Sequence, residues 1–225
     1  MIHLSDVRKV FNQGRPNEVW ALNGINLTLR QGGATVFRGP SGSGKTTLLT
    51  LVGCLARPSS GRVRLKDRDI SGLPERFLTE IRRSTFGFVF QNFNLLSGLS
   101  AIQNVMIPAY PRGLPHKALR RRAMALLDML DMGDKAEAET RWLSGGEAQR
   151  IAIARALIND PEVVIADEPT ANLDSGLSAQ FLAIAGRLKR DGKTLLVTSH
   201  DPFVCEAALV DRVVTLHDGR IVEAG

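Results

Sequence analysis

One glycine-rich run carries the residue types of a phosphate-binding loop. Residues 39–46, GPSGSGKT, follow the spacing G-x-x-x-x-G-K-[ST]. The glycines let the backbone curl so that successive N–H groups point at phosphate oxygens. Lys45 adds a positive charge for the β- and γ-phosphates, and the Thr46 hydroxyl can bind Mg²⁺. The run predicts a nucleotide phosphate site, with an ordinary glycine turn as the alternative.

Two adjacent carboxylates, Asp167 and Glu168, follow the apolar run 163–166, VVIA. Adjacent side chains on a strand point to opposite sides, so the two acids should have different roles. Beside a phosphate loop, Asp167 would face Mg²⁺. Glu168 would face the γ-phosphate, where a carboxylate can orient or deprotonate an attacking water. A strand that ends in two acids by chance is the alternative.

A second run, residues 143–147 (LSGGE), precedes a predicted helix. Ser144 and Glu147 have the spacing of a capping box, so this run could be only a capped helix start. Two glycines and a serine at a helix N-terminus also form an anion site. Since the chain has only one glycine loop for a nucleotide, the second site is expected to complete the site of another copy.

Short apolar runs and helical patterns indicate how these motifs are positioned. Alternating Ile25, Leu27 and Leu29 predict a half-buried strand of an antiparallel sheet. A strand is predicted at residues 34–38, directly before the glycine run, and strands buried on both faces at residues 86–90, 163–166, 195–198 and 213–216. A helix is predicted at residues 45–55, and helical segments between the strands favour a parallel sheet in an α/β fold.

The middle of the chain differs from the rest. Residues 100–159 contain no strand candidate, but residues 117–132 and 147–158 have helical patterns. We expect one domain over residues 1–225. Within this domain, residues from about 1 to 91 and from about 160 to 225 would form the α/β core. Residues from about 92 to 159 would form an inserted helical subdomain.

The three large motifs, in this order and spacing, resemble the nucleotide-binding domain of ATP-binding cassette (ABC) ATPases. Smaller motifs match as well. Gln91 resembles the Q-loop glutamine that senses Mg²⁺ and contacts the membrane partner. Residues 171–174, ANLD, resemble the D-loop, and His200 resembles the switch histidine that contacts the γ-phosphate. The resemblance covers essentially the whole chain and implies a P-loop NTPase core, with a small antiparallel β subdomain and a helical subdomain.

The resemblance also implies a set of site residues. Those expected to act in ATP hydrolysis are Glu168, His200, Gln91 and Lys45. Those expected to hold Mg²⁺ are Thr46, Gln91 and Asp167. Those expected to bind ATP are Phe11, Gly39, Pro40, Ser41, Gly42, Ser43, Gly44, Lys45, Thr46 and Thr47, with Ser144, Gly145, Gly146 and Asp174 of a second copy.

An aromatic residue is expected to stack on the adenine. Phe11 sits where the family usually places this residue, and Trp20 is the other candidate. A core position for Phe11 is the alternative.

The resemblance implies a mechanism and partners. Two copies pair head to tail, each ATP is held between the loop of one copy and Ser144 and Gly146 of the other, and hydrolysis releases the pair. The chain is expected to drive separate transmembrane permease subunits and to contact the membrane only through them. Their coupling helix would enter a groove beside Gln91, with Phe93 and Leu95 to Leu96 as its walls.

One branch of the family is favoured. Residues 52–58, 87–96 and 166–174 resemble the lipoprotein-release and macrolide-export ATPases. This implies export or membrane extraction of a lipoprotein, lipid, peptide or hydrophobic compound. Residues 139–142, ETRW, depart from the proline-containing approach that is common in this branch. An amino-acid-type importer ATPase is the alternative, and a soluble ABC ATPase outside transport is a weaker one.

Composition narrows the class of protein. The 225 residues are 44% hydrophobic and 23% charged, which excludes a disordered or fibrous chain. No apolar run is long enough to span a membrane, no secretory signal is apparent, and the two cysteines lack metal spacing. The net charge of +6 first suggests a polyanionic partner; with ATP as the expected anion, nucleic acid ranks last. We expect a cytoplasmic protein, peripheral on the cytoplasmic face of the inner or plasma membrane.

Overall fold

The computed structural model describes residues 1–171 and 173–224, and their strands form two sheets. The strands of the larger sheet are β3 (Ala34–Arg38), β6 (Phe86–Val89), β7 (Val163–Asp167), β8 (Thr194–Thr198), β9 (Arg212–His217) and β10 (Arg220–Ala224). Their order is β10-β9-β3-β8-β7-β6, and every neighbouring pair except β9 and β10 is parallel. The predicted parallel sheet is confirmed, and each predicted buried run is one of its strands.

The smaller sheet is antiparallel. Its strands are β1 (Ile2–Phe11), β2 (Val19–Leu29), β4 (Ser60–Leu65) and β5 (Arg68–Asp69), in the order β2-β1-β4-β5. The alternating Ile25, Leu27 and Leu29 are buried on β2, as predicted. The sequence did not reveal β1, because register shifts between Leu4 and Val10 interrupt its alternation of buried and exposed residues.

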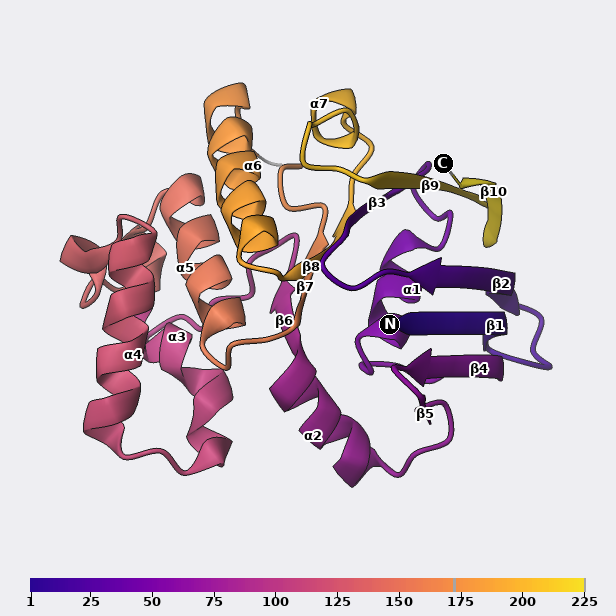
Figure 1. Ribbon diagram of the computed structural model, residues 1–225, viewed down its shortest axis with the longest axis horizontal. Helices are drawn as coiled ribbons and strands as arrows, with labels where there is room; N and C mark the ends of the chain where they lie inside the picture. Colours follow the sequence, from indigo (N-terminus) through magenta and orange to yellow (C-terminus); the bar gives the residue numbers. More distant parts are fainter. Residues whose placement is uncertain (172, 225) are drawn as a thin grey trace.

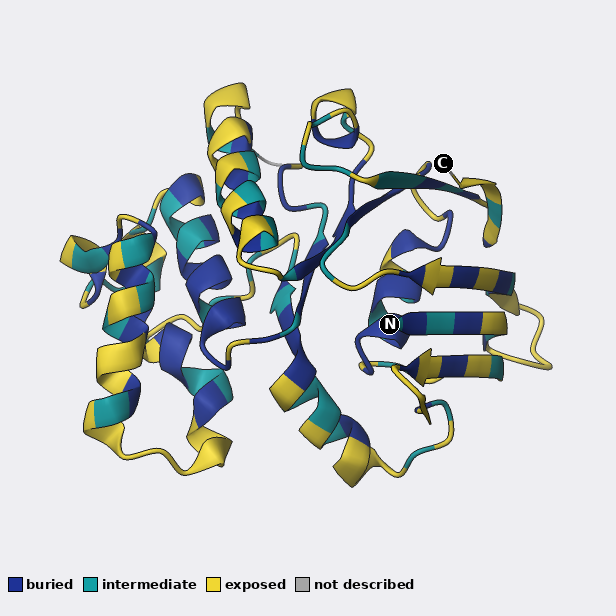
Figure 2. Ribbon diagram, in the orientation of Figure 1, coloured by how far each residue is buried: buried dark blue, intermediate teal, exposed yellow. Residues whose placement is uncertain are grey.

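The two faces of the larger sheet bury two separate cores. Successive residues of β7 alternate between them: Val164 and Ala166 belong to one core, and Val163 and Ile165 to the other. In Figure 2, the buried residues lie on the central strands and on the parts of the helices and of the smaller sheet that adjoin them. A strand with both faces covered reads as a continuous apolar run, which is why it was predictable from sequence.

Helices cover the larger sheet. They are α1 (Lys45–Val52), α2 (Glu75–Thr85), α3 (Ala101–Met106), α4 (His116–Met129), α5 (Gly145–Leu157), α6 (Ser175–Arg190) and α7 (Pro202–Cys205), with 3₁₀ turns η1 (Ile107–Arg112), η2 (Gly133–Lys135) and η3 (Thr140–Trp142). In Figure 1, α4, α5 and α6 lie on one side of the sheet, and α1 with the antiparallel sheet on the other. Within residues 1–171 and 173–224, none of the helices combines the length and apolarity needed to cross a bilayer.

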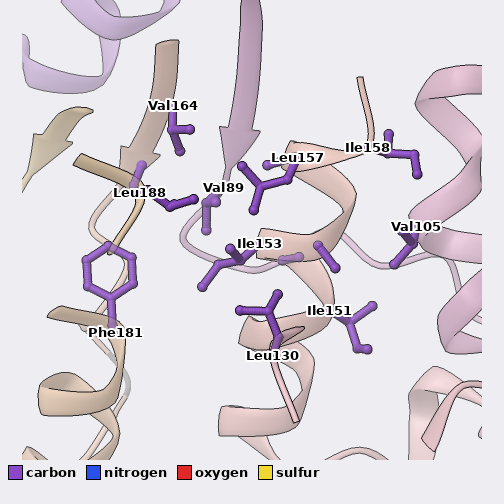
Figure 3. Packing of buried hydrophobic residues seen from close by; sticks show 14 of the residues in the cluster. Val89, Val105, Leu130, Ile151, Ile153, Leu157, Ile158, Val164, Phe181 and Leu188 are labelled. Carbon is purple, nitrogen blue, oxygen red and sulfur yellow. The ribbon is translucent and has the colours of Figure 1, made fainter. Parts of the chain in front are cut away.

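Residues 100–159 contain helices and no strand, as predicted. On α4 the expected apolar face is buried at Leu119, Ala123 and Leu127. The helix was predicted to continue to residue 132 but ends at Met129, since Asp131 has a left-handed φ of 55°. In Figure 3, Ile153 of α5 points toward Val89 of β6, which shows how this helical region joins the core.

The first helix is shorter than predicted. We expected a helix over residues 45–55, but α1 ends at Val52. Cys54 takes a left-handed φ of 60°, which cannot continue an α-helix. Gly53 packs so close to the Phe88 ring that a Cβ would lie 2.5 Å from it. Tertiary packing against β6 therefore sets the end of this helix.

A second close approach joins β6 to α5 and gives a stability prediction. A Cβ on Gly87 would overlap the carbonyl oxygen of Ala156, and backbone cannot yield as a flexible side chain does. We expect Gly87→Ala to lower the free energy of unfolding by about 2 kcal/mol or more in urea denaturation. Gly72→Ala is the control, because nothing lies within 4 Å of a Cβ there. Equal stability of the two variants would contradict this packing.

Candidate functional site

The glycine loop, residues 39–44, lies between β3 and α1. Gly39 and Gly44 have φ values of 153° and 99°, which side chains with a Cβ rarely adopt. A Cβ on Gly39 would overlap the carbonyl oxygen of Leu216, and one on Gly44 that of Ala21. Both positions therefore require glycine, for backbone conformation and for close packing.

A buried polar group in this loop lacks a partner. The Ser43 hydroxyl is buried and makes no hydrogen bond within the described part of the chain. Such groups are rare, since an unpaired buried hydroxyl costs free energy. The positive end of the α1 dipole adjoins it and favours anions. The loop thus fits an oxygen-rich anionic ligand such as phosphate.

Lys45 lies at the floor of the loop. Only 8% of the residue is exposed, and its Nζ donates hydrogen bonds to the carbonyl oxygens of Gly39 (2.7 Å) and Pro40 (3.1 Å). The same Nζ lies 3.6 Å from Glu168 Oε1. A positive charge is therefore fixed beneath the glycine loop.

The two acids at the end of β7 turn to different partners, as their adjacent positions predicted. Asp167 Oδ1 accepts hydrogen bonds from the hydroxyls of Thr46 (3.1 Å) and Thr198 (2.6 Å). Glu168 instead faces Lys45. The Glu168 backbone has a left-handed φ of 45°, and its N–H donates to Thr198 Oγ1 at 2.7 Å. One hydroxyl on β8 therefore supports both acids.

His200 and Gln91 reach the same place. His200 Nδ1 lies 3.2 Å from Glu168 Oε2. Both residues line a cavity of about 680 Å³. The remaining lining residues are Val19, Trp20, Ala21, residues 39–47, Glu168, Ala171 and Asp218. The structure thus brings all four predicted catalytic residues together around one cavity. Lys45 belongs to the loop, and Gln91, Glu168 and His200 come from other segments of the chain.

The two candidate aromatic residues differ in position. Trp20 lines the cavity, and its Nε1 donates to Glu18 Oε1 at 2.8 Å. Phe11 is not among the lining residues; its ring is 44% exposed with Lys9 Nζ 5.2 Å from its centroid. In the β1–β2 pairing, however, Phe11 lies opposite Val19, which does line the cavity.

The expected second anion site lies elsewhere in the chain. Ser144, Gly145 and Gly146 begin α5 and do not line the cavity. The predicted capping box is present: the Glu147 N–H donates to Ser144 Oγ, and the Ser144 N–H donates to Glu147 Oε2 at 2.8 Å. The bond from Ser144 holds the pKa of Glu147 below its usual value.

The start of α6 adjoins this second site. Asp174 caps α6 by accepting a hydrogen bond from the Leu177 N–H at 2.9 Å. A Cβ on Gly146 would lie 2.5 Å from Leu177 Cδ2, so the first turns of α5 and α6 are in tight contact. Asn172 of the expected D-loop lies outside the described residues. Ser144 and Asp174 therefore belong to one surface region, separate from the cavity.

The sequence profile described as "ABC transporter" matches residues 22–171 of this chain. The chain belongs to the ABC transporter family. Two relatives illustrate this. The macrolide export ATP-binding/permease protein MacB of Rhodospirillum rubrum is 45% identical over 223 residues, 99% of this chain and 34% of that protein. The uncharacterized ABC transporter ATP-binding protein YvrO of Bacillus subtilis is 43% identical over 222 residues, 99% of this chain and 96% of that protein.

A solved structure agrees with the family assignment. The dimeric ATP-binding cassette MJ0796, described as a post-hydrolysis state bound to ADP and Pi, matches with a TM-score of 0.91. It is 36% identical, and the match covers 100% of this chain and 98% of that one. The expected P-loop fold is thereby confirmed. This chain spans about a third of the length of the macrolide export relatives.

The side-chain oxygens of Thr46 and Asp167 are candidate ligands for a metal ion. Among residues 1–171 and 173–224, no group of three or more His, Cys, Asp and Glu side chains is arranged around one point. Asp167 and the Thr46 hydroxyl lie together, which suits a hard cation that keeps water or phosphate oxygens as its other ligands. These residues fit Mg²⁺ better than a metal held by protein side chains alone.

Four residues near the cavity were not singled out from sequence. Thr198 supports both acids, and Val19, Ala21 and Asp218 line the cavity. Thr198 ends a predicted strand, and its place beside Asp167 follows only from the strand order. Sequence offers no comparable signal for Val19, Ala21 and Asp218, because β2 and the turn between β9 and β10 reach the cavity only in the folded chain.

The capping box of α5 gives a prediction about pH. A carboxylate whose pKa is lowered in the folded state stabilises that state above its unfolded pKa, and this stabilisation is lost as pH falls through the folded pKa. We expect Glu147→Gln to be less stable than the unaltered protein at pH 7. The difference should shrink below about pH 4.3, the ordinary pKa of glutamate. Thermal unfolding from pH 7 to 3 measures it; a constant difference would show that the charge of Glu147 has no role.

Proposed function

We propose that this chain binds ATP in the cavity beside the glycine loop and hydrolyses it. The observation that carries the proposal is the convergence of Lys45, Glu168 and the Thr46–Asp167 pair on one loop with a buried, unpaired serine hydroxyl. The triphosphate would lie on the N–H groups of residues 39–47, as predicted for Gly39 to Thr47. The related cassette MJ0796, whose structure contains ADP and Pi, supports this assignment.

In this proposal each side chain has one task. Lys45 places a fixed positive charge against the β- and γ-phosphates, where charge develops during phosphoryl transfer. Glu168 orients the attacking water and accepts its proton. His200, in contact with Glu168, steadies that carboxylate at the γ-phosphate end of the cavity. Lys45 Nζ lies 3.6 Å from Glu168 Oε1, so the positive charge and the carboxylate face the same part of the cavity.

We propose Asp167, Thr46 and Gln91 as the residues that hold Mg²⁺. Mg²⁺ would neutralise charge on the β- and γ-phosphate oxygens. The hydroxyl of Thr198 donates a hydrogen bond to the same Asp167 oxygen that accepts one from Thr46, and so holds this carboxylate toward Thr46.

We further propose that two copies pair head to tail on ATP. Ser144, Gly145, Gly146 and Asp174 would then complete the cavity of the partner. The support is that α5 begins with a capped N-terminus that lies outside its own chain's cavity. The dimeric state of the cassette MJ0796 supports the same arrangement.

The motion of this pair would drive transmembrane permease subunits, with residues of about 92–159 acting as the helical subdomain. We propose that these subunits are separate chains, which place the cassette at the cytoplasmic face of the membrane. YvrO, 96% of which is covered by the match and whose name describes an ATP-binding protein, supports this. The names of the macrolide export relatives support export of a hydrophobic or lipid-like cargo.

A groove suited to a membrane partner lies along β6, between α2 and α5. Its volume is about 290 Å³. Its apolar lining includes Leu55, Phe86, Phe88, Phe90, Pro108 and Ala156. Gln91 and the expected wall residues Phe93, Leu95 and Leu96 do not line it, so the groove expected beside Gln91 stays a prediction. Copurification tests this assignment: a four-span permease with a large extracytoplasmic domain would support export, and a permease that works with a solute-binding protein would support import.

Glu168→Gln tests the catalytic assignment. The substitution keeps the shape of the side chain but removes the group that accepts the proton, so hydrolysis should fall at least about 100-fold. ATP should then accumulate in a stable dimer, measured by light scattering after size-exclusion chromatography. Glu206→Gln, at an exposed position, is the matched control. Undiminished hydrolysis in Glu168→Gln would remove Glu168 from this role.

The affinity for ADP of two alanine variants tests which aromatic residue stacks on the adenine. Loss of base stacking is worth about 1–3 kcal/mol, so we expect Phe11→Ala to weaken ADP binding by about 10-fold or more. Trp20→Ala should change it less, and neither variant should change the affinity for tripolyphosphate, which has no base. Isothermal titration calorimetry gives all three values. If only Trp20→Ala weakens ADP, Trp20 is the stacking residue.

A further inference from the structure

A buried glutamine joins α5 to the segment after Glu168. Gln149 is 3% exposed, and its Nε2 donates a hydrogen bond to the carbonyl oxygen of Pro169 at 2.6 Å. A buried amide with its single acceptor on another segment fixes that segment, because breaking the bond would leave polar groups unpaired. Neither the cavity nor the second anion site includes Gln149.

The segment that Gln149 holds is the one that carries the proposed catalytic base. Pro169 directly follows Glu168, whose φ of 45° is unfavourable for a residue with a side chain. The bond from the Glu168 N–H to Thr198 supports this conformation from one side. The bond from Gln149 to Pro169 supports it from the other.

The N-terminus of the same helix carries the expected second anion site. Ser144 caps α5, and Gln149 follows five residues later, about 7.5 Å along the helix axis at 1.5 Å per residue. Because a helix is stiff over so short a distance, a displacement of this capped N-terminus moves Gln149 with it. The first turn of α5 also contacts α6, where the Leu177 side chain lies against Gly146.

We propose that Gln149 is a positioning residue that couples the two ATP sites of the dimer. The proposal rests on the proposed function, in which Ser144 contacts the ATP held by the partner copy. Engagement of that ATP sets the position of α5. Gln149 passes this position to Pro169 and so to the Glu168 of its own cavity. Each site then reaches its full rate only when the opposite site holds ATP.

The test is the steady-state kinetics of Gln149→Met, which keeps an unbranched side chain of similar length but has no donor for Pro169. We expect kcat to fall about 10-fold, within the usual range of coupling between sites, with KM changed less than about 2-fold. The Hill coefficient for ATP, expected between 1 and about 2 for two sites, should fall toward 1. ADP affinity, and ATP-dependent dimerisation measured in a Glu168→Gln background, should stay within about 2-fold.

Two further variants make the result decisive. Gln180→Leu removes the hydrogen bond that Arg150 of α5 donates to Gln180 of α6. This variant should leave kcat and the Hill coefficient unchanged. Gln149→Asn keeps the amide on a shorter stem and should recover part of the rate lost in Gln149→Met. If kcat and cooperativity persist in Gln149→Met, or if both Gln149 variants fail to fold, the positioning role is overturned.

The outcomes also separate this inference from the proposed function. No ATP hydrolysis by the unaltered protein, together with no ATP-bound dimer of Glu168→Gln, would remove the proposed function itself. A dimer and normal hydrolysis with a Hill coefficient of 1 in the unaltered protein would remove only the coupling by Gln149.

Discussion

The close approach of Lys45 and Glu168 is the constraint on which the site depends. Both side chains are largely buried, with 9% and 13% exposed, and their charged atoms lie 3.6 Å apart. A charge taken out of water is costly unless opposite charge and hydrogen bonds compensate it. The carbonyl oxygens of Gly39 and Pro40 supply those bonds. The tight glycine loop and the left-handed turn at Glu168 follow from this requirement.

The parallel sheet meets that requirement by bringing strand ends together. β3, β7 and β8 end at the same edge, where ligand sites of open α/β sheets occur. Asp167 and Thr198 are paired residues of β7 and β8, so one hydroxyl reaches both the Asp167 carboxylate and the Glu168 N–H. The register of one strand pair thus fixes the directions of two acids. A shift by one residue would turn both side chains to the wrong faces.

Sequence predicted the features that have local or periodic causes. The glycine loop has a strict spacing, and the strands covered on both faces form continuous apolar runs. It missed β1, where register shifts remove the alternation, and misplaced the end of α1, which packing at Gly53 determines. The expected D-loop remains partly undescribed at Asn172. The partner of Gln149 was not predictable either, because a helical pattern gives a side chain's face and not its acceptor on a distant segment.

The division of the functional residues within one chain has a mechanical consequence. Ser144 and Asp174 cap α5 and α6, whose first turns contact each other at Gly146 and Leu177 without space for a methyl group. This contact is made by the end of the Leu177 side chain, so it places the two capped ends side by side without locking the two helices together. The buried hydrogen bond from Gln149 to the carbonyl oxygen of Pro169 is what ties α5 to the segment after β7. In the proposed dimer, a partner's ligand that contacts Ser144 would act through this bond on the segment that carries Glu168.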